Sequence, residues 1–109
     1  MQTTRPIAPA TVLAAFKALS DPLRLQVVEL LREREMCVCD LCDRLSVSQS
    51  KLSFHLKILR QASLLTARQE GRWIYYSLNG PGFVGLEQYL TEVGQLSAAL
   101  PARACSPGD

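Results

Sequence analysis

Three of the four cysteines in the chain lie within six residues, at Cys37, Cys39 and Cys42. Thiolates are soft ligands that favour soft ions, and trivalent arsenic and antimony are ions of this kind. A position at a helix start also favours the thiolate form of a cysteine. Three thiols suit a three-coordinate ion, whereas structural zinc usually takes four protein ligands. The cluster therefore predicts a binding site for As(III) or Sb(III).

The spacing of these cysteines constrains how one ion can reach all of them. With about 100° per residue on a regular helix, Cys39 and Cys42 lie about 60° apart, and Cys37 and Cys39 about 200° apart. One regular helix therefore cannot bring the three thiols together. The conflict eases if Cys37 is the N-cap of a helix over about 38–45, with Asp40 at its third position as the acidic half of a capping box. Binding all three thiols to one ion should still distort this helix start.

Other interpretations of the cysteines stay open. The Cys39-x-x-Cys42 spacing occurs in unrelated proteins, and clustered thiols also serve as small apolar core residues or as a redox pair. A thiol oxidoreductase would need a βαβ context that the pattern lacks, so we predict that the chain is not an enzyme. Cys105 lies in a C-terminal tail, and we exclude it from the site because a mobile residue must first be ordered to bind an ion.

The elements around the cluster follow from apolar spacing and from turn residues. We predict a loose arm over 1–8, helices over about 9–19, 22–34, 38–45, 49–62 and 83–98, a hairpin over 64–78, and a disordered tail over 100–109. Gly71 supplies the hairpin turn, and Gly80, Pro81 and Gly82 break the chain before the last helix. The fold class is mainly α with a β-hairpin wing, in one domain over 9–99.

Two of these helices, over 38–45 and 49–62, are joined by a brief turn and form a helix-turn-helix. His55 lies on the apolar face of the second helix, and we interpret it as a hydrogen-bonded core residue. The opposite face carries short polar and basic side chains that suit a DNA major groove. The candidate DNA-binding residues on this helix and the hairpin are Ser48, Gln49, Ser50, Lys51, Ser53, Phe54, Lys57, Arg68 and Arg72.

The charge distribution supports this placement better than the formal net charge of +2 does. Residues 43–72 contain six basic and two acidic side chains, so they carry +4 and leave −2 for the rest of the chain. The segment has the charge expected of a surface that binds double-stranded DNA. No apolar run reaches the roughly 18 residues of a membrane span, and the N-terminus lacks the order of a signal peptide. We therefore expect a cytoplasmic protein.

A domain this small often gains stability from an oligomer interface. The first and last helices both carry apolar stripes, and the stripe of the last helix is long enough to pair with its copy in a second subunit. We expect a homodimer whose interface includes Val12, Phe16, Leu86, Leu90 and Val93.

The order of these elements resembles the ArsR family of bacterial metalloregulatory repressors over roughly residues 10–97. The most specific match is Cys-Val-Cys-Asp-Leu-Cys at 37–42, and the stretch 48–57 is similar to the family's recognition helix. The resemblance implies a homodimeric winged helix-turn-helix repressor of an arsenical-resistance operon, bound to an inverted-repeat operator. It implies release when As(III) or Sb(III) binds Cys37, Cys39 and Cys42, with no catalytic cofactor. A repressor switched by thiol oxidation is the alternative.

Two features bear on that resemblance. Many relatives have arginine where this chain has Phe54, so a polar contact there is not implied, and a thymine methyl is the expected partner. The last helix offers Glu87 and Glu92 but no histidine. It therefore lacks the acidic and histidine ligand set of zinc-sensing relatives, which argues against zinc as the main inducer.

Overall fold

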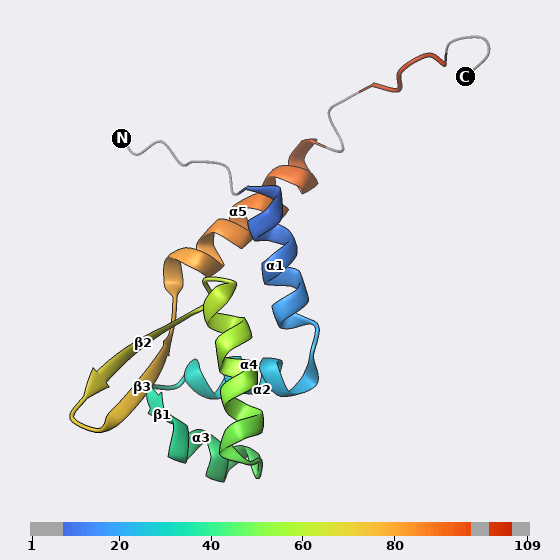
Figure 1. The fold of residues 1–109 in the computed structure, drawn as a ribbon. Helices are drawn as coiled ribbons and strands as arrows, with labels where there is room; N and C mark the ends of the chain where they lie inside the picture. The colour runs from blue at the N-terminus through green and yellow to red at the C-terminus, as the bar shows by residue number, and fades with distance from the viewer. Residues whose placement is uncertain (1–7, 97–100, 106–109) are drawn as a thin grey trace, which may run out of the picture.

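The structure, a computed structural model, describes residues 8–96 and 101–105. The elements in these residues are α1 (Pro9–Leu19), α2 (Pro22–Leu31), β1 (Met36–Cys37), α3 (Val38–Leu45), α4 (Gln49–Gln61), β2 (Leu65–Glu70), β3 (Trp73–Leu78) and α5 (Gly80–Leu96). In Figure 1, α1 and α5 lie together at one end of the molecule, α3 lies at the other end, and the β2–β3 hairpin projects to one side. This arrangement confirms the predicted winged helix-turn-helix. Residues 1–7 of the predicted arm lie outside the described residues, as do residues 100 and 106–109 of the predicted tail, while residues 101–105 form no helix or strand.

Polar caps explain where α2 and α4 begin. The Asp21 carboxylate accepts a hydrogen bond from the Arg24 N–H at 3.0 Å, and Pro22 occupies the first turn, where its missing N–H has little effect. The Ser48 hydroxyl accepts from the Lys51 N–H at 3.2 Å, which confirms the predicted cap of α4. Between α3 and α4, Ser46 adopts the left-handed conformation with φ of 54° and ends α3. The helix-turn-helix is thus fixed by local chemistry at both ends of its turn.

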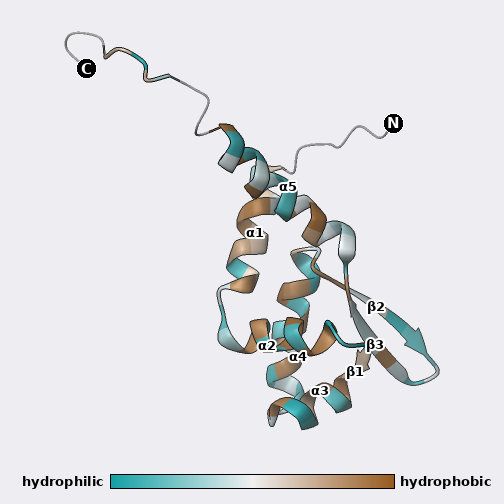
Figure 2. Ribbon diagram, turned by 180° about the vertical axis from the view of Figure 1, so that it is seen from behind, coloured by the Kyte–Doolittle hydropathy of each residue, from teal (hydrophilic) through white to brown (hydrophobic). Residues whose placement is uncertain are grey.

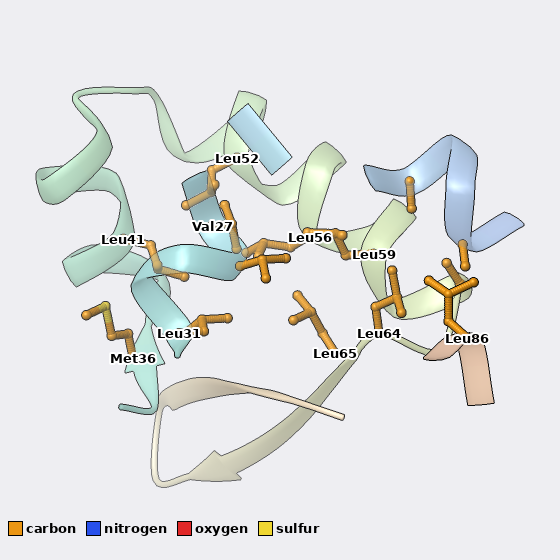
Figure 3. Packing of buried hydrophobic residues seen from close by; sticks show 14 of the residues in the cluster. Val27, Leu31, Met36, Leu41, Leu52, Leu56, Leu59, Leu64, Leu65 and Leu86 are labelled. Atoms are coloured by element: carbon orange, nitrogen blue, oxygen red, sulfur yellow. The ribbon is translucent and has the colours of Figure 1, made fainter. Parts of the chain in front are cut away.

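The buried face of α4 holds the recognition helix against the rest of the domain. Leu52, Leu56 and Leu59 are at most 1% exposed and pack with leucines and valines from every other helix and from β2 (Figure 3). Burial of one such side chain contributes about 1.5–3 kcal/mol. The opposite face of α4 stays exposed, and it carries the positions of this helix that are predicted to contact DNA, which are Gln49, Ser50, Lys51, Ser53, Phe54 and Lys57.

Three details of the fold differ from the sequence prediction. Helix α2 ends at Leu31 rather than near 34, because the chain turns there toward β1. Helix α5 begins at Gly80 rather than 83, since the Asn79 carbonyl accepts from the N–H groups of Gly82 and Phe83 and so draws the glycines into the first turn. The strand β1 was not predicted, because two residues carry no periodic signal.

The sheet is antiparallel with the order β1-β3-β2, so β3 is its central strand. Tyr75 of β3 pairs with Cys37 on one side and with Arg68 on the other. Gly71 at the hairpin turn has a φ of 62°, as expected for the residue that reverses the chain. The first cysteine of the cluster therefore lies on the same rung of the sheet as an arginine of the wing.

One glycine makes a contact that a larger residue cannot reproduce. A Cβ on Gly82 would lie 2.0 Å from the Ser63 carbonyl oxygen, which is held in place by a 2.7 Å hydrogen bond from the Asn79 amide. We expect Gly82→Ala to lower the free energy of unfolding by about 1–3 kcal/mol, through overpacking. Gly80→Ala is the matched control, because nothing lies within 4 Å of its Cβ position. Urea unfolding at one fixed protein concentration measures both variants, and equal midpoints would refute this contact.

Candidate functional site

The cysteine cluster lies where β1 becomes α3. Cys37 is the last residue of β1 and the N-cap of α3, with φ of −81° and ψ of 166°, as predicted. Its side chain accepts no capping hydrogen bond. Cys39 is exposed in the first turn, and Cys42 is half-buried against the core. All three thiols are free, as is that of Cys105.

The three thiols are not gathered into a ligand set in this conformation. Among the described residues, no group of three or more histidine, cysteine, aspartate or glutamate side chains is arranged to hold a metal ion. This agrees with the backbone, since Cys37 lies in extended backbone outside α3 whereas Cys39 and Cys42 lie within the helix. Binding of one ion by all three residues requires the junction of β1 and α3 to change shape.

The environment of Cys42 opposes the thiolate form. Burial raises the pKa of the Cys42 thiol, and the nearby Cys39, Asp43 and Cys37 raise it further. The expectation that the helix start favours the thiolate is therefore wrong for Cys42, because this residue lies in the second turn and packs against the core. Cys42 also touches the turn through its backbone, since its carbonyl accepts from the Val47 N–H at 3.2 Å and from the Ser46 N–H.

The predicted DNA-binding side chains lie on α4, at its N-cap and on the wing. All nine are exposed, and Phe54, at 61%, is the most exposed of the large apolar residues that the structure describes. A cleft of about 320 Å³ lies between α4 and β3, lined by Ser53, Lys57, Arg60, Gln61 and Tyr76. Its basic and hydroxyl groups suit a phosphate backbone that runs past the recognition helix.

The structure gives Arg68 a different environment from that of Arg72. The Arg68 guanidinium donates to Glu35 through Nε and Nη2, at 2.9 and 2.7 Å, and to Glu70 through Nη1 at 2.6 Å. It also lies 4.7 Å from the centre of the Tyr75 ring. Hydrogen bonds from Arg68 hold the pKa of the Glu35 carboxyl below its usual range. Arg68 is thus already paired within the protein, whereas Arg72, at the hairpin tip, forms no ion pair with a described residue.

His55 is hydrogen-bonded, as predicted, but it is half-buried and not a residue of the core. Its Nδ1 lies 3.0 Å from Arg24 Nη1, and Nδ1 acts as the acceptor in this contact because a guanidinium can only donate. Arg24 also donates to the carbonyls of Ala18 and Lys17 at the end of α1. One arginine therefore joins α1, α2 and the recognition helix.

Comparison with known proteins identifies the family. Residues 21–67 match the family described as "Bacterial regulatory protein, arsR family". The arsenical resistance operon repressor of Bacillus subtilis (strain 168) is 50% identical over 72 residues, covering 65% of this chain and 69% of that protein. The chain belongs to the ArsR family. It is accordingly a DNA-binding transcriptional regulator and not an enzyme.

Further relatives agree with this assignment. The arsenical resistance operon repressor of Escherichia coli (strain K12) is 51% identical over 65 residues, which cover 59% of this chain and 56% of that protein. A solved structure titled as a possible transcriptional regulator for arsenical resistance is 30% identical, with a TM-score of 0.66 over 82% of this chain and 98% of its own. The ArsR-family regulator RHA00566, at 21% identity and a TM-score of 0.78, supports the fold. No helix in the described residues is long and apolar enough to cross a membrane.

Three residues that line the cleft beside the recognition helix were not among the predicted DNA-binding residues. Arg60, Gln61 and Tyr76 line the cleft beside α4. Arg60 follows Lys57 by three residues, so helical spacing could have placed it on the same face. Tyr76 could not have been found in this way, because only the tertiary packing of the wing brings β3 beside the end of α4.

Two charged residues test the DNA surface directly. We expect Lys51→Ala and Arg72→Ala each to weaken operator binding and to lower the slope of log K against log salt by about one, because each substitution removes one phosphate contact. Arg68→Ala is the comparison, since its guanidinium is already neutralised by Glu35 and Glu70 and should change the slope less. Fluorescence anisotropy at several salt concentrations measures all three. Unchanged slopes for Lys51→Ala and Arg72→Ala would show that α4 and the wing do not contact DNA as described.

Proposed function

We propose that this ArsR-family protein is a homodimeric repressor of an arsenical-resistance operon. It binds an inverted-repeat operator in the cytoplasm and leaves it when As(III) or Sb(III) binds Cys37, Cys39 and Cys42. The observation that carries the proposal is the position of three free thiols at the start of α3, directly before the turn to the recognition helix. The similarity to arsenical resistance operon repressors supports the choice of inducer.

The donor set fits a trivalent metalloid. Three cysteines supply three soft sulfur ligands, and the described residues near them add no histidine. Each thiol exchanges its proton for a bond to arsenic, and each hydroxyl of arsenous acid leaves as water. The oxidation state of arsenic does not change, so the reaction needs no oxidant or reductant.

The backbone around Cys42 supplies a path from the thiols to the recognition helix. The Cys42 carbonyl accepts from Ser46 and Val47, which form the turn, and the next residue, Ser48, caps α4. A shift of the α3 start that moves Cys42 therefore moves the turn and the first residues of α4. Gln49, Ser50 and Lys51 lie in that first turn and are among the proposed DNA contacts.

Binding and release are then linked by one free energy. A change from mostly bound to mostly released operator requires the inducer to favour the released form by about 10⁴-fold, or roughly 5.5 kcal/mol. Three bonds from thiolates to a soft ion can supply a preference of this size only if the operator-bound form keeps the thiols apart. The separated thiols at the β1–α3 junction agree with that requirement.

The dimer is proposed through α1 and α5. Phe16, Leu90 and Val93 are 41–51% exposed in the protomer, and Figure 2 shows apolar residues along both helices. The other two predicted interface residues, Val12 and Leu86, are only 6% and 7% exposed and pack in the protomer's own core. Leu13, Val84 and Leu96, which are half-exposed on the same helices, are better candidates for the seam.

A gel shift on the DNA upstream of the protein's own gene tests the function. The protein should retard this DNA under reducing conditions and should release it when arsenite is added. Retardation that persists at saturating arsenite would refute induction by As(III). Absence of specific retardation would refute repression at this site.

Thiol oxidation is the second candidate for the switch, because Cys39 is both free and exposed. Mass measurement separates the two mechanisms. Arsenite should give one arsenic per protomer with loss of three protons, located in the peptide that contains residues 37–42. A switch based on oxidation would instead show release with peroxide and a disulfide or oxygen adduct, with no arsenic retained.

A further inference from the structure

The residue before β1 is bound to the wing. Both carboxylate oxygens of Glu35 accept from Arg68 of β2, and Glu35 Oε2 also accepts from the Ser77 hydroxyl of β3 at 3.0 Å. Glu35 is two residues before Cys37 and 33 residues before Arg68. A single side chain thus joins the segment that enters the cysteine cluster to both strands of the hairpin.

The backbone makes a second connection at the same place. Cys37 pairs with Tyr75 in the sheet, and Tyr75 pairs with Arg68 on its other side. The Arg68 guanidinium also lies over the Tyr75 ring. Met36, between Glu35 and Cys37, is 2% exposed and anchors the short strand in the core (Figure 3). The rung and the Glu35 contacts therefore hold Cys37 in the extended strand.

These contacts oppose the assembly of the thiol site. In strand β1, Cys37 cannot approach Cys39 and Cys42 unless the β1–α3 junction changes shape. Movement of Cys37 toward the other thiols strains its pairing with Tyr75. Because Met36 joins Cys37 to Glu35, the same movement strains the hydrogen bonds of Glu35. Since β1 has only two residues, few hydrogen bonds resist its separation from β3. Figure 1 shows β1 at the edge of the sheet, next to β3 and directly before α3.

We propose that Glu35 is a positioning residue that couples the cysteine site to the wing, by binding Arg68 and Ser77 only while Cys37 lies in β1. The inference rests on the proposed induction by As(III). Inducer binding separates β1 from β3, frees Arg68 from Glu35 and loosens the hairpin that carries Arg72. Release from DNA thus involves the wing as well as the recognition helix. The role of Arg68 is then to hold the sensor, not to contact phosphate.

The inference predicts that Glu35→Gln binds arsenite more tightly than the parent. Loss of the Glu35 contacts makes the conformation with assembled thiols less costly, and the apparent affinity for arsenite follows the population of that conformation. We expect the Kd for arsenite to fall about fivefold, because a partly exposed ion pair contributes a free energy of about that size. The arsenite concentration needed for operator release should fall with it. Without arsenite, the affinity for the operator should change less than the affinity for arsenite does, because the conformation that binds the operator already predominates.

Matched variants separate coupling from general damage. Glu33→Gln removes a negative charge two residues earlier in the chain. Glu70→Gln removes the other carboxylate that binds Arg68, in a contact that lies entirely within the hairpin. Neither should tighten arsenite binding. The double variant Glu35→Gln with Arg68→Gln should resemble the single variants, because both remove one interaction. Arsenite affinity of Glu35→Gln that is equal to or weaker than that of Glu33→Gln would overturn the proposal.

Hydrogen exchange reads the wing directly. Arsenite should speed exchange of the β3 amides of the parent, and Glu35→Gln should speed it without arsenite, relative to Glu33→Gln. If the parent binds arsenite and leaves the operator while β3 exchange is unchanged, the coupling through Glu35 is wrong and the proposed function stands. If the parent binds no arsenite, the proposed function fails. Even then, the exchange rates without arsenite test the link between Glu35 and the wing. If the β3 amides exchange equally fast in Glu35→Gln and Glu33→Gln, Glu35 does not hold the wing and the proposal is overturned.

Discussion

Replacement of Cys37, Cys39 or Cys42 by serine is expected to leave a repressor that binds its operator but no longer leaves it when arsenite is added. Each substitution removes one of three sulfur ligands while the folded structure, in which the thiols make no capping hydrogen bond at the α3 start, keeps its shape. The effect of saturating arsenite on the operator Kd should fall from about 10⁴-fold to less than about tenfold. Cys37 and Cys39 should be the most sensitive, because bringing them together distorts the backbone most.

Cys105→Ser is the control for these variants. Cys105 lies beyond α5, outside the Cys37–Cys42 cluster, and its thiol is free and exposed. It should release the operator at the same arsenite concentration as the parent. Anisotropy titrations of labelled operator measure all four variants. If the three cluster variants released DNA as readily as the parent, the cysteines at 37–42 would not be the switch.

Charged residues on α5 are expected to abolish both the dimer and specific DNA binding. Leu90 and Val93 are 51% and 50% exposed, and aspartate at both positions would place two charges in the proposed apolar seam. A two-fold operator needs two recognition helices at a fixed spacing, so the monomer should bind at least about 10³-fold more weakly, near its non-specific affinity. Sedimentation equilibrium and anisotropy measure the two losses.

Leu25→Asp is the matched control for the dimer, because Leu25 is 47% exposed but lies on α2. It should remain a dimer with operator affinity close to that of the parent. A dimer that survived the changes at Leu90 and Val93 would place the seam elsewhere, and the exposed Leu13 and Phe16 of α1 would be the next candidates.

Local chemistry explains which parts of the fold could be predicted from the sequence. Ser48 before a polar helix, Asp21 before Pro22 and Gly71 between two β-rich segments each act through their immediate neighbours, and the structure confirms all three. The N-cap position of Cys37 was also correct, although the three thiols that this position was expected to bring together stay apart in this conformation.

Long-range packing explains the rest. The pairing of Glu35 with Arg68 joins residues far apart in the chain, and both look like ordinary surface charges in the sequence. Apolar spacing identified the faces of α1 and α5 but did not separate Val12 and Leu86, which the protomer covers itself, from Leu90 and Val93. The raised pKa of Cys42 depends on burial that the position within α3 does not reveal.

X-ray absorption at the arsenic edge tests the three-cysteine site most directly. The measurement counts the atoms bound to arsenic in the protein loaded with one equivalent of arsenite per protomer under reducing conditions. Coordination by Cys37, Cys39 and Cys42 predicts three sulfur neighbours and no oxygen, in the parent and in Cys105→Ser alike. Arsenic with fewer than three sulfur neighbours, or with oxygen still bound, would contradict it.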